Sequence, residues 1–437
     1  MSQEKSKDMR KVALTSLSGT SIEWYDFFLY GTAAAVIFPQ AFFPQDLPTM
    51  VVLIASFSTF AVGFLARPLG GVIFGHFGDR VGRKKTLVVA LMMMGVATTM
   101  IGFLPTYQSI GVLAPLMLVV LRFVQGLAIG GQWGGAMLLV TENAPKDQRG
   151  WYGAYAQAGA PVGVILANLA FLGVSAGMSE ADFMDWGWRL PFIASFVLIL
   201  ISMYVQLKLE DTPAFKALAA HQAPKEAVQQ TVVKSPVIEV LRRYPKRIVL
   251  AAGAFLSIQV TFYILIAFVV AYGVNSPTVT LSRDMMLTAV LVAAAIMVPS
   301  QFYFSGLSDR LGRKTVYRWG AILTGLWGFA LFPLIDTGQP VLICFAVTMG
   351  LVFLGMQYGP QAAFFTELFS TEVRYSGASL GYQLGAIVGG ALAPTIAVLL
   401  WNNFGIFWVS VYIALAAILT LMSLSQLTET QGSDLMT

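Results

Sequence analysis

The sequence Gly19-Thr-Ser-Ile-Glu-Trp-Tyr-Asp-Phe-Phe-Leu-Tyr-Gly31 lies inside an apolar run from Val12 to Phe38. A run of this length predicts a transmembrane helix, because roughly 20 residues at about 1.5 Å each cross a hydrocarbon core of about 30 Å. Glu23 and Asp26 would then lie within the membrane, where each charge costs on the order of 2.5–3.5 kcal/mol. They are three residues apart and share one helical face. We therefore expect this face to point to a polar interior, which we interpret as a substrate pathway.

The composition predicts an integral membrane protein. Of 437 residues, 57% are hydrophobic and 11% are charged, whereas soluble domains average about 45–50% apolar and 25% charged residues. Uncharged runs of about 20 residues recur along the whole chain, which excludes a merely apolar soluble core. The first run is too long for the core of a signal peptide, so we expect it to remain as the first span.

Charge and cysteine content exclude several other classes. The net charge is +5, but the basic residues lie in short segments between apolar runs, which argues against nucleic-acid binding. The single cysteine, Cys344, excludes an internal disulfide and a multi-cysteine metal site. His76 lies at the loop end of its span and His221 in the central linker, so neither is a candidate for chemistry inside the membrane. We expect no cofactor and no metal, and the spans show no nucleophile–base or metal-ligand spacing that would indicate an enzyme.

Apolar runs bounded by glycine, proline and charge predict twelve spans. If the N-terminus is cytoplasmic, 23 of the 27 lysines and arginines lie in cytoplasmic segments, two lie outside and two lie within spans. This asymmetry predicts that both termini face the cytoplasm. The predicted spans are 12–38, 50–77, 86–104, 111–140, 151–176, 188–208, 247–272, 285–307, 318–335, 340–367, 376–401 and 405–426.

The chain repeats itself once. Gly78-Asp-Arg-Val-Gly-Arg-Lys84 recurs as Ser308-Asp-Arg-Leu-Gly-Arg-Lys314, and the pair Glu142 and Arg149 recurs as Glu367 and Arg374. We predict an N-terminal bundle of six spans at 1–208, a charged cytoplasmic linker at 209–246, and a C-terminal bundle of six spans with a short tail at 247–437. Parallel repeats of this kind build transporters in which one half moves against the other around a central site.

These motifs resemble those of the major facilitator superfamily. The loop Asp-Arg-x-Gly-Arg-Lys in both halves, the twelve-span layout and the pattern Arg122-x-x-Gln-Gly-x-x-x-Gly130 carry the resemblance. Further stretches resemble the metabolite:proton symporters, a group that includes shikimate, α-ketoglutarate, citrate and proline/betaine carriers. They are Glu23-Trp-Tyr-Asp-Phe27, Arg67-Pro-Leu-Gly-Gly71, Gly75-His-Phe-Gly-Asp-Arg80, Gln132-Trp-Gly-Gly135, Glu142-Asn-Ala-Pro145, Trp186-Gly-Trp-Arg-Leu-Pro-Phe192 and Glu372-Val-Arg-Tyr-Ser-Gly377. The resemblance implies an all-α membrane protein of twelve transmembrane helices in two pseudo-symmetric six-helix bundles.

Four charges are predicted well inside spans: Glu23, Asp26, Arg67 and Arg122. Unpaired, they would cost roughly 10–14 kcal/mol together, so they must meet each other, water or a ligand. One interpretation is a static ion-pair network that holds helices 1, 2 and 4 together. We favour a functional interpretation, in which a carboxylate near an arginine is protonated from one side of the membrane and releases the proton to the other.

Asp26 is the preferred proton carrier and Glu23 the second candidate, and the pair can also share one proton. The resemblance would place Asp26 and Arg122 at a central cavity lined by helices 1, 4, 7 and 10. Arg122 keeps its charge and forks well onto carboxylates. It therefore either binds an anionic substrate directly or pairs with Asp26 until the substrate displaces it.

Neutral polar and aromatic residues are candidates for the rest of a substrate site. Each alone is more often an interhelical hydrogen bond than a ligand contact, but as a set they suit the wall of a pocket for a polar metabolite. The candidates are Tyr30, Gln125, Gln259, Tyr263, Gln357, Gln361 and Tyr382, with Arg67, Gln157, Tyr358 and Gln383 as further possibilities.

The duplicated loops are predicted to act as gates. The resemblance would place Asp79 against the start of helix 11 near Arg374, and Asp309 against the start of helix 5 near Arg149. The alternative, a purely topological role, explains the basic residues but not the repeated aspartate. The predicted gating residues are Asp79, Arg80, Arg83, Glu142, Arg149, Asp309, Arg310, Arg313, Glu367 and Arg374.

The sequence therefore favours a proton-coupled symporter that imports a small polar metabolite by alternating access. We expect a carboxylate substrate, because Arg122 offers the anion a partner. The alternatives are a zwitterionic solute of the proline or betaine type, an uncoupled facilitator, and a sensor that binds without transport. The expected partners are the substrate, a proton and the lipid bilayer, and we expect a monomer.

Overall fold

The computed structural model describes residues 3–81, 83–130, 140–141, 144–210, 242–369 and 374–432. The side chains of 3–8, 11, 12, 15, 75–81, 83–87, 205–210 and 374–376 also lie outside the described set. In the part of the chain that is described, every regular element is a helix.

The long helices fall into an N-terminal and a C-terminal set. The N-terminal set is α1 (Gln3–Val36), α3 (Thr49–Val81), α4 (Arg83–Phe103), α6 (Leu113–Gly130), α8 (Arg149–Ser175) and α10 (Arg189–Glu210). The C-terminal set begins with α13 (Pro245–Tyr263), which continues through the π-helical turn η2 (Ile264–Phe268) into α14 (Val269–Asn275). Three uninterrupted helices follow, α15 (Arg283–Leu311), α16 (Arg313–Asp336) and α17 (Pro340–Glu367). The set ends with α18 (Arg374–Gly385), which continues through the π-helical turn η3 (Ala386–Ala391) into α19 (Ala393–Phe404), and with α20 (Phe407–Gln426). Short helices connect them: α2 (Phe38–Ala41), α5 (Tyr107–Ile110), α9 (Glu180–Asp182) and η1 (Phe183–Gly187).

These helices form the twelve predicted spans, six in each half. Among the described residues, nine helices are long and apolar enough to cross a membrane, and Glu180–Gly187 with Arg189–Tyr204 reaches that length only as a pair, bent by 50°. The remaining two are α1, whose apolar run is interrupted by Glu23 and Asp26, and α4, whose apolar part is Val88–Phe103. The predicted fold class is confirmed. Residues 211–241, most of the predicted linker, lie outside the described residues.

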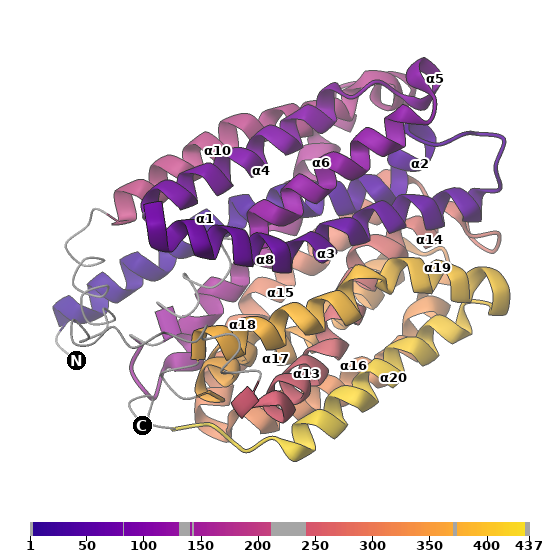
Figure 1. Ribbon diagram of the computed structural model, residues 1–437. Helices are drawn as coiled ribbons and strands as arrows, with labels where there is room; N and C mark the ends of the chain where they lie inside the picture. The colour runs from indigo at the N-terminus through magenta and orange to yellow at the C-terminus, as the bar shows by residue number, and fades with distance from the viewer. Residues whose placement is uncertain are drawn as a thin grey trace.

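The two halves lie side by side along the length of the bundle. In Figure 1 the N-terminal half lies above and the C-terminal half below. Two seams join them, since α8 packs against α15 and α17, and α3 packs against η3 and α19. The start of α1 and the end of α20 lie at the same end of the bundle (Figure 1), which we call the terminal end, and we call the opposite end the distal end.

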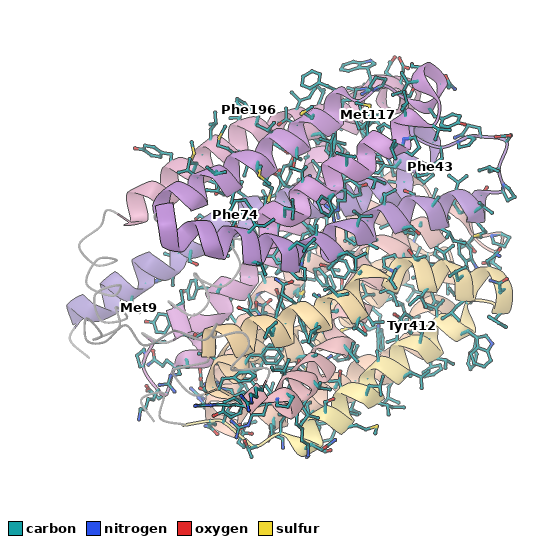
Figure 2. The ribbon with its side chains drawn as sticks, in the orientation of Figure 1. Met9, Phe43, Phe74, Met117, Phe196 and Tyr412 are labelled. Atoms are coloured by element: carbon teal, nitrogen blue, oxygen red, sulfur yellow. The ribbon has the colours of Figure 1, made fainter. Side chains whose placement is uncertain are left out.

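Large apolar side chains cover the outside of the bundle. Phe196 on α10 and Met117 on α6 are 40% and 41% exposed (Figure 2). Asp26, Arg67 and Arg122 are instead completely or almost completely buried. Apolar residues outside and charges inside are what a hydrocarbon solvent requires.

Helices α3 and α6 approach each other backbone to backbone. A Cβ on Gly126 would lie 2.2 Å from the carbonyl oxygen of Gly63, and one on Gly130 would lie 1.9 Å from that of Arg67. Only glycine leaves room for this approach. The close contact brings the two arginines of these helices, Arg67 and Arg122, into one region of the N-terminal half.

Candidate functional site

Two buried arginines lie against one phenylalanine. The guanidinium carbon of Arg122 is 4.2 Å from the ring centre of Phe27, and that of Arg67 is 4.5 Å from the same centre, so the two carbons are at most about 8.7 Å apart. Arg122 also lies 4.2 Å from the ring centre of Tyr30 and 4.6 Å from that of Phe60. Aromatic faces stabilise a cation while leaving its N–H groups available to a ligand. We call these five residues the arginine–aromatic cluster.

Both arginines keep buried N–H groups without a hydrogen-bond partner. Arg122 donates from Nη1 to Gln125 Oε1 at 3.0 Å, but its Nε and Nη2 are unpartnered among the described residues. The same holds for Nε and Nη2 of Arg67. An uncompensated guanidinium inside a membrane is costly, and its fork geometry matches a carboxylate. The cluster therefore has the chemistry of an anion site.

Asp26 precedes Phe27 of this cluster in the chain but faces a different set of helices. It is fully buried, and neither carboxylate oxygen has a hydrogen-bond partner among the described residues. The hydroxyls of Thr98 on α4 and Ser195 on α10 face it, so its surroundings belong to the N-terminal half. Glu23, the other predicted acid, is half-buried and takes part in an interaction. Of the two acids, Asp26 is the one buried without a hydrogen-bond partner.

A small cavity lies between the two halves. Its volume is about 10 Å³, roughly the room of one water molecule. It is lined by Trp24, Phe28, Ala160, Ile258, Gln259, Phe262, Tyr263, Tyr358 and Tyr382. Four predicted residues, Gln259, Tyr263, Tyr358 and Tyr382, therefore meet here, and the Nε2 of Gln259 is buried without a partner among the described residues.

The lining of this cavity does not include Asp26 or Arg122, which differs from the expectation. Successive residues of a helix are about 100° apart, so Asp26 points about 200° around α1 from Trp24. Trp24 and Phe28, one turn apart, face the cavity in its place. Arg122 lies behind the ring of Phe27, on the side of α3 and α6.

The other predicted polar residues divide between the seam and the interior of each half. Gln157 Nε2 donates to Gln361 Oε1 at 2.8 Å and joins α8 to α17 across the two halves. Gln357 Nε2 donates to Thr324 Oγ1 at 2.9 Å, inside the C-terminal half, and the Tyr30 hydroxyl donates to Thr59 Oγ1 at 2.7 Å, inside the N-terminal half. Gln383 lies on α18 outside the cavity lining, with a buried and unpartnered Oε1 among the described residues. Gln357 and the Tyr30 hydroxyl therefore bond within their own halves, while the Tyr30 ring lies against Arg122.

At the terminal end, Asp309 joins the two halves. Its Oδ1 accepts the N–H of Gly150 and its Oδ2 that of Trp151, both at 2.9 Å. The contact that was predicted between Asp309 and the start of the fifth span is thus present. A carboxylate at this position also stabilises the helix dipole of α8.

A buried ion network surrounds this contact. Arg313 Nη1 lies 2.6 Å from Asp309 Oδ1, and its Nη2 lies 3.4 Å from Glu367 Oε1. Arg149 Nη1 lies 3.7 Å from the same oxygen of Glu367. The network links α8 of one half to α15 and α17 of the other. Arg310 is exposed, and the side chains of Asp79, Arg80, Arg83, Glu142 and Arg374, the remaining predicted gate residues, lie outside the described set.

The segment after α20 packs on this network, which the sequence did not predict. Glu429 accepts the backbone N–H groups of Arg313 and Lys314 at 2.9 and 3.0 Å, and so caps α16. The Thr430 hydroxyl donates to Glu367 Oε2 at 2.7 Å, and Gln431 Nε2 donates to the carbonyl oxygen of Asp309. We call residues 427–432 the tail clasp.

At the distal end, a second set of contacts joins the halves, also unpredicted. Both terminal nitrogens of Arg283, at the start of α15, bind the two oxygens of Glu180 at 2.9 Å. The Ser175 hydroxyl at the end of α8 donates to Asp284 Oδ2 at 2.8 Å. The Arg283 guanidinium also lies 3.9 Å from the ring centre of Phe183. The seam between α8 and α15 is therefore closed at both ends.

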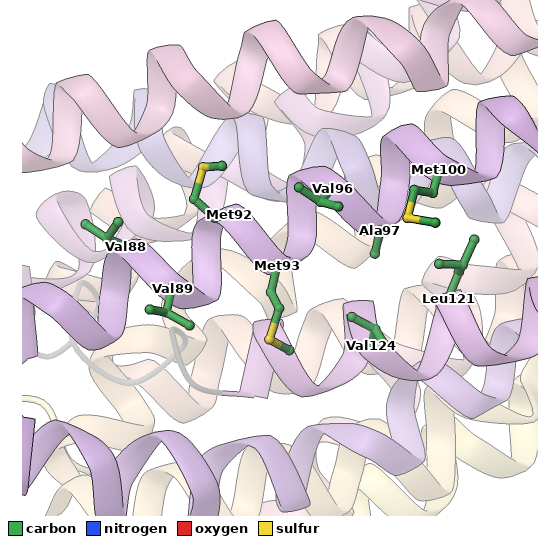
Figure 3. A pocket seen from close by; sticks show the side chains of 9 residues that line it. All are labelled: Val88, Val89, Met92, Met93, Val96, Ala97, Met100, Leu121 and Val124. Atoms are coloured by element: carbon green, nitrogen blue, oxygen red, sulfur yellow. The ribbon is translucent and has the colours of Figure 1, made fainter.

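A larger groove lies between α4 and α6 (Figure 3). Its side chains, among them Met92, Met93, Met100, Leu121 and Val124, are apolar throughout. Without a placed polar group it does not suit a polar metabolite, and its position on outward-facing helices suits contact with lipid chains.

A bundle of two helical halves, with buried charges in one half and a polar cavity at the seam, is typical of a transporter. The comparisons with known proteins agree. The sequence model of the Major Facilitator Superfamily matches residues 19–381. This chain belongs to that superfamily, whose members are transporters and not enzymes.

Named relatives show which kinds of transporter in the superfamily this chain resembles. The Escherichia coli K12 protein named inner membrane metabolite transport protein YhjE is 42% identical over 434 residues, which cover 97% of this chain and 95% of that protein. The shikimate transporter of the same strain is 40% identical over 416 residues, covering 93% and 91%. The Escherichia coli K12 proline/betaine transporter is 31% identical over 433 residues, covering 98% and 85%. The xylose transporter XylE from E. coli, in a partially occluded inward-open conformation, superposes with a TM-score of 0.73 at 16% identity over 98% of this chain and 100% of XylE, which supports the fold alone.

Proposed function

We propose that this protein is a proton-coupled symporter that imports a small organic acid across the bacterial inner membrane, as a monomer with both termini in the cytoplasm. Residues 1–208 and 247–437 would move against each other about the central seam. The names of the relatives, a metabolite transport protein and a shikimate transporter, support the substrate class. The terminal end, with Asp309 and its ion network, would be the cytoplasmic gate.

One observation carries the proposal: among the described residues, the N-terminal half buries an acid and two arginines that form no ion pair with one another. Asp26, Arg122 and Arg67 all keep polar atoms without hydrogen-bond partners among the described residues. A buried charge without a partner is destabilising, so such groups persist where partners change during function. Asp26 would be neutral when protonated, and the free N–H groups of Arg122 would take the carboxylate of the substrate.

Coupled transport would then follow if the two halves change which end is open when the interior holds both a proton and an anion, but not when it holds one of the two alone. With a proton on Asp26 and an anion on Arg122, the interior carries fewer uncompensated charges, and the halves can pass through the closed state. With Asp26 charged or Arg122 without an anion, the closed state would be less stable by several kcal/mol, because it buries more uncompensated charge. Proton and anion would therefore cross together.

A zwitterion of the betaine type is a second candidate, favoured by the cavity lining. Trp24, Phe28, Phe262 and Tyr263 surround the cavity together with two further tyrosines. Aromatic faces recognise quaternary ammonium groups. The 31% identical relative named as a proline/betaine transporter is consistent with this candidate.

Uptake by purified protein in liposomes tests the proposal. The panel is radiolabelled shikimate, citrate, betaine and proline, each measured with an imposed pH gradient, acidic outside, and without one. The proposal predicts that an acid of the panel accumulates above equilibrium only with the gradient. Gradient-driven accumulation of betaine or proline alone would support the second candidate, and equilibration without accumulation would indicate an uncoupled facilitator.

A further inference from the structure

We propose that Thr98 and Gln125 are positioning residues that connect the protonation of Asp26 to the guanidinium of Arg122. The inference rests on the proposed function, in which Asp26 takes the proton and Arg122 the substrate anion. It adds the physical link between the two, which are not paired directly among the described residues.

A chain of hydrogen bonds leads from Arg122 toward Asp26. Arg122 Nη1 donates to Gln125 Oε1 at 3.0 Å, and Gln125 Nε2 donates to Thr98 Oγ1 at 2.7 Å. The Thr98 hydroxyl faces the carboxyl of Asp26, and in this state it donates to the Met94 carbonyl oxygen at 2.9 Å. All four side chains of the chain, Asp26, Thr98, Gln125 and Arg122, are buried.

Thr98 can serve only one acceptor at a time, because a hydroxyl carries a single proton. When Asp26 is a carboxylate, rotation of the hydroxyl gives it a donor, and the bond to Met94 is lost. The bonds then run in one direction, from Arg122 through Gln125 and Thr98 to the carboxylate, and each polarises the next. When Asp26 is protonated, Thr98 returns to Met94 and the bond between Gln125 and Arg122 weakens.

The consequence concerns the substrate. A charged Asp26 would strengthen the hydrogen bond from Arg122 to Gln125. A protonated Asp26 would weaken that bond and make the guanidinium of Arg122 more available to an anion. Protonation and anion binding would therefore favour each other, as symport requires, and the coupling is reciprocal.

The charges around Asp26 leave few other routes. Among the described residues, the charged group that acts on Asp26 is Glu23, one turn earlier on α1, while α4 and α10 present hydroxyls. Charges near Arg122 come from Arg67, and the hydroxyls of Tyr30 and Tyr263 also act on it. Ser195 faces Asp26 as Thr98 does, but its hydroxyl lies within donating distance of the Pro191 carbonyl oxygen, at 3.4 Å, and among the described residues no hydrogen bond leads from it to Arg122. Ser195 is therefore a matched control for Thr98.

The link can be measured without a substrate. Infrared difference spectra of the purified protein are recorded while the pH is changed, with the carboxyl band assigned through Asp26→Asn and the guanidinium band through Arg122→Lys. We expect the Arg122 band to shift as Asp26 is titrated in the unmodified protein. This shift should be lost in Thr98→Val and Gln125→Leu and kept in Thr98→Ser and Ser195→Ala. An Arg122 band that does not follow Asp26 in the unmodified protein, or that still follows it in Thr98→Val, would overturn the link.

Liposome uptake separates this inference from the function on which it rests. If Thr98→Val keeps the Arg122 response while Asp26→Asn abolishes gradient-driven uptake, the link is wrong and the symport proposal stands. If Asp26→Asn keeps gradient-driven uptake, the proton role of Asp26 is wrong whatever the spectra show. Should Gln125→Leu fail to fold, the pair Thr98→Val and Thr98→Ser still decides the link, because Thr98→Val keeps the shape of threonine without its hydroxyl and Thr98→Ser keeps the hydroxyl without the methyl group.

Discussion

Asp309 in the C-terminal half accepts the backbone N–H of Gly150 in the N-terminal half at 2.9 Å. With the matching bond to Trp151, this contact makes one side chain the connection between the end of α15 and the start of α8. Hydrogen bonds to a charged group contribute about 1.5–3 kcal/mol each. In the proposed transport cycle, a contact of this size between the two halves would bias which end of the transporter is closed.

Replacing Asp309 by Asn should open the terminal end. Opening is measured with a cysteine introduced by Ala362→Cys, at a buried position on α17, in a variant that lacks the native cysteine through Cys344→Ser. We expect the rate of maleimide labelling of this cysteine to rise several-fold in Asp309→Asn. The asparagine amide has one acceptor oxygen for the two N–H groups at the start of α8, and it has no charge to pair with Arg313. Asp336→Asn is the matched control, since Asp336 bonds Tyr272 and Thr278 within its own half. Equal labelling in the two variants would contradict a gate at Asp309.

Replacing Glu180 by Gln should act at the distal end and with a smaller effect. Glu180 is 69% exposed in its side chain, and exposed ion pairs contribute about 0.2–1 kcal/mol. We expect a cysteine at Leu287, buried near the start of α15, to label faster by up to about fivefold, with labelling at Ala362 unchanged or slower. Asp182→Asn, another exposed acid of this segment, is the control, because among the described residues the Asp182 carboxylate bonds only Ser179, three residues earlier. Faster labelling at both ends would instead indicate general destabilisation.

The tail clasp should stabilise the closed terminal end. Glu429→Ala removes both acceptors at the start of α16, a loss comparable to that of a helix cap, about 0.5–2 kcal/mol. Because the neighbouring Thr430 and Gln431 bind Glu367 and Asp309, we expect faster labelling at Ala362, in the same direction as Asp309→Asn. Ser425→Ala, whose hydroxyl bonds its own helix, should have no effect. A lower melting temperature with unchanged labelling would show that the clasp only caps α16.

Gly63→Ala should weaken substrate binding without unfolding the protein. A Cβ at Gly63 would lie 2.6 Å from Arg122 Nε, so the end of this flexible side chain must move off the rings that hold it. We expect affinity for the transported acid, measured by thermal shift or scintillation proximity, to fall by about tenfold or more, equivalent to about 1.4 kcal/mol. Gly71→Ala on the same helix is the control, because a Cβ there would lie 3.4 Å from the Gly130 carbonyl oxygen. Equal affinities in the two variants would remove Arg122 from the site.

Much of the fold follows from the sequence, because a bilayer imposes length and hydrophobicity on each span. The helix ends differ where other forces act. α1 begins at Gln3, well before the apolar run at Val12, because a helix can continue into water beyond the membrane. The π-helical turns η2 and η3 have no signature in periodicity, since they depend on packing against the other half.

The sequence predicts which charged residues are buried in the N-terminal half, but not how they pack. Charge counting found Asp26 and Arg122, but it predicted a carboxylate beside the arginine, whereas Phe27, Tyr30 and Phe60 surround Arg122. Cation–π contacts carry no charge pattern that a single sequence reveals. Helical spacing shows that Trp24 and Asp26 point apart, but only the packing decides which of them meets the C-terminal half.

Proton movement on substrate addition tests the central claim most directly. De-energised cells that express the protein are given the acid identified in the liposome panel, with shikimate as the first probe, and the external pH is recorded together with exchange of labelled substrate. The unmodified protein should make the medium alkaline as proton and acid enter together, and Asp26→Asn should exchange substrate without this pH change. Alkalinisation by Asp26→Asn at the rate of the unmodified protein would contradict the account.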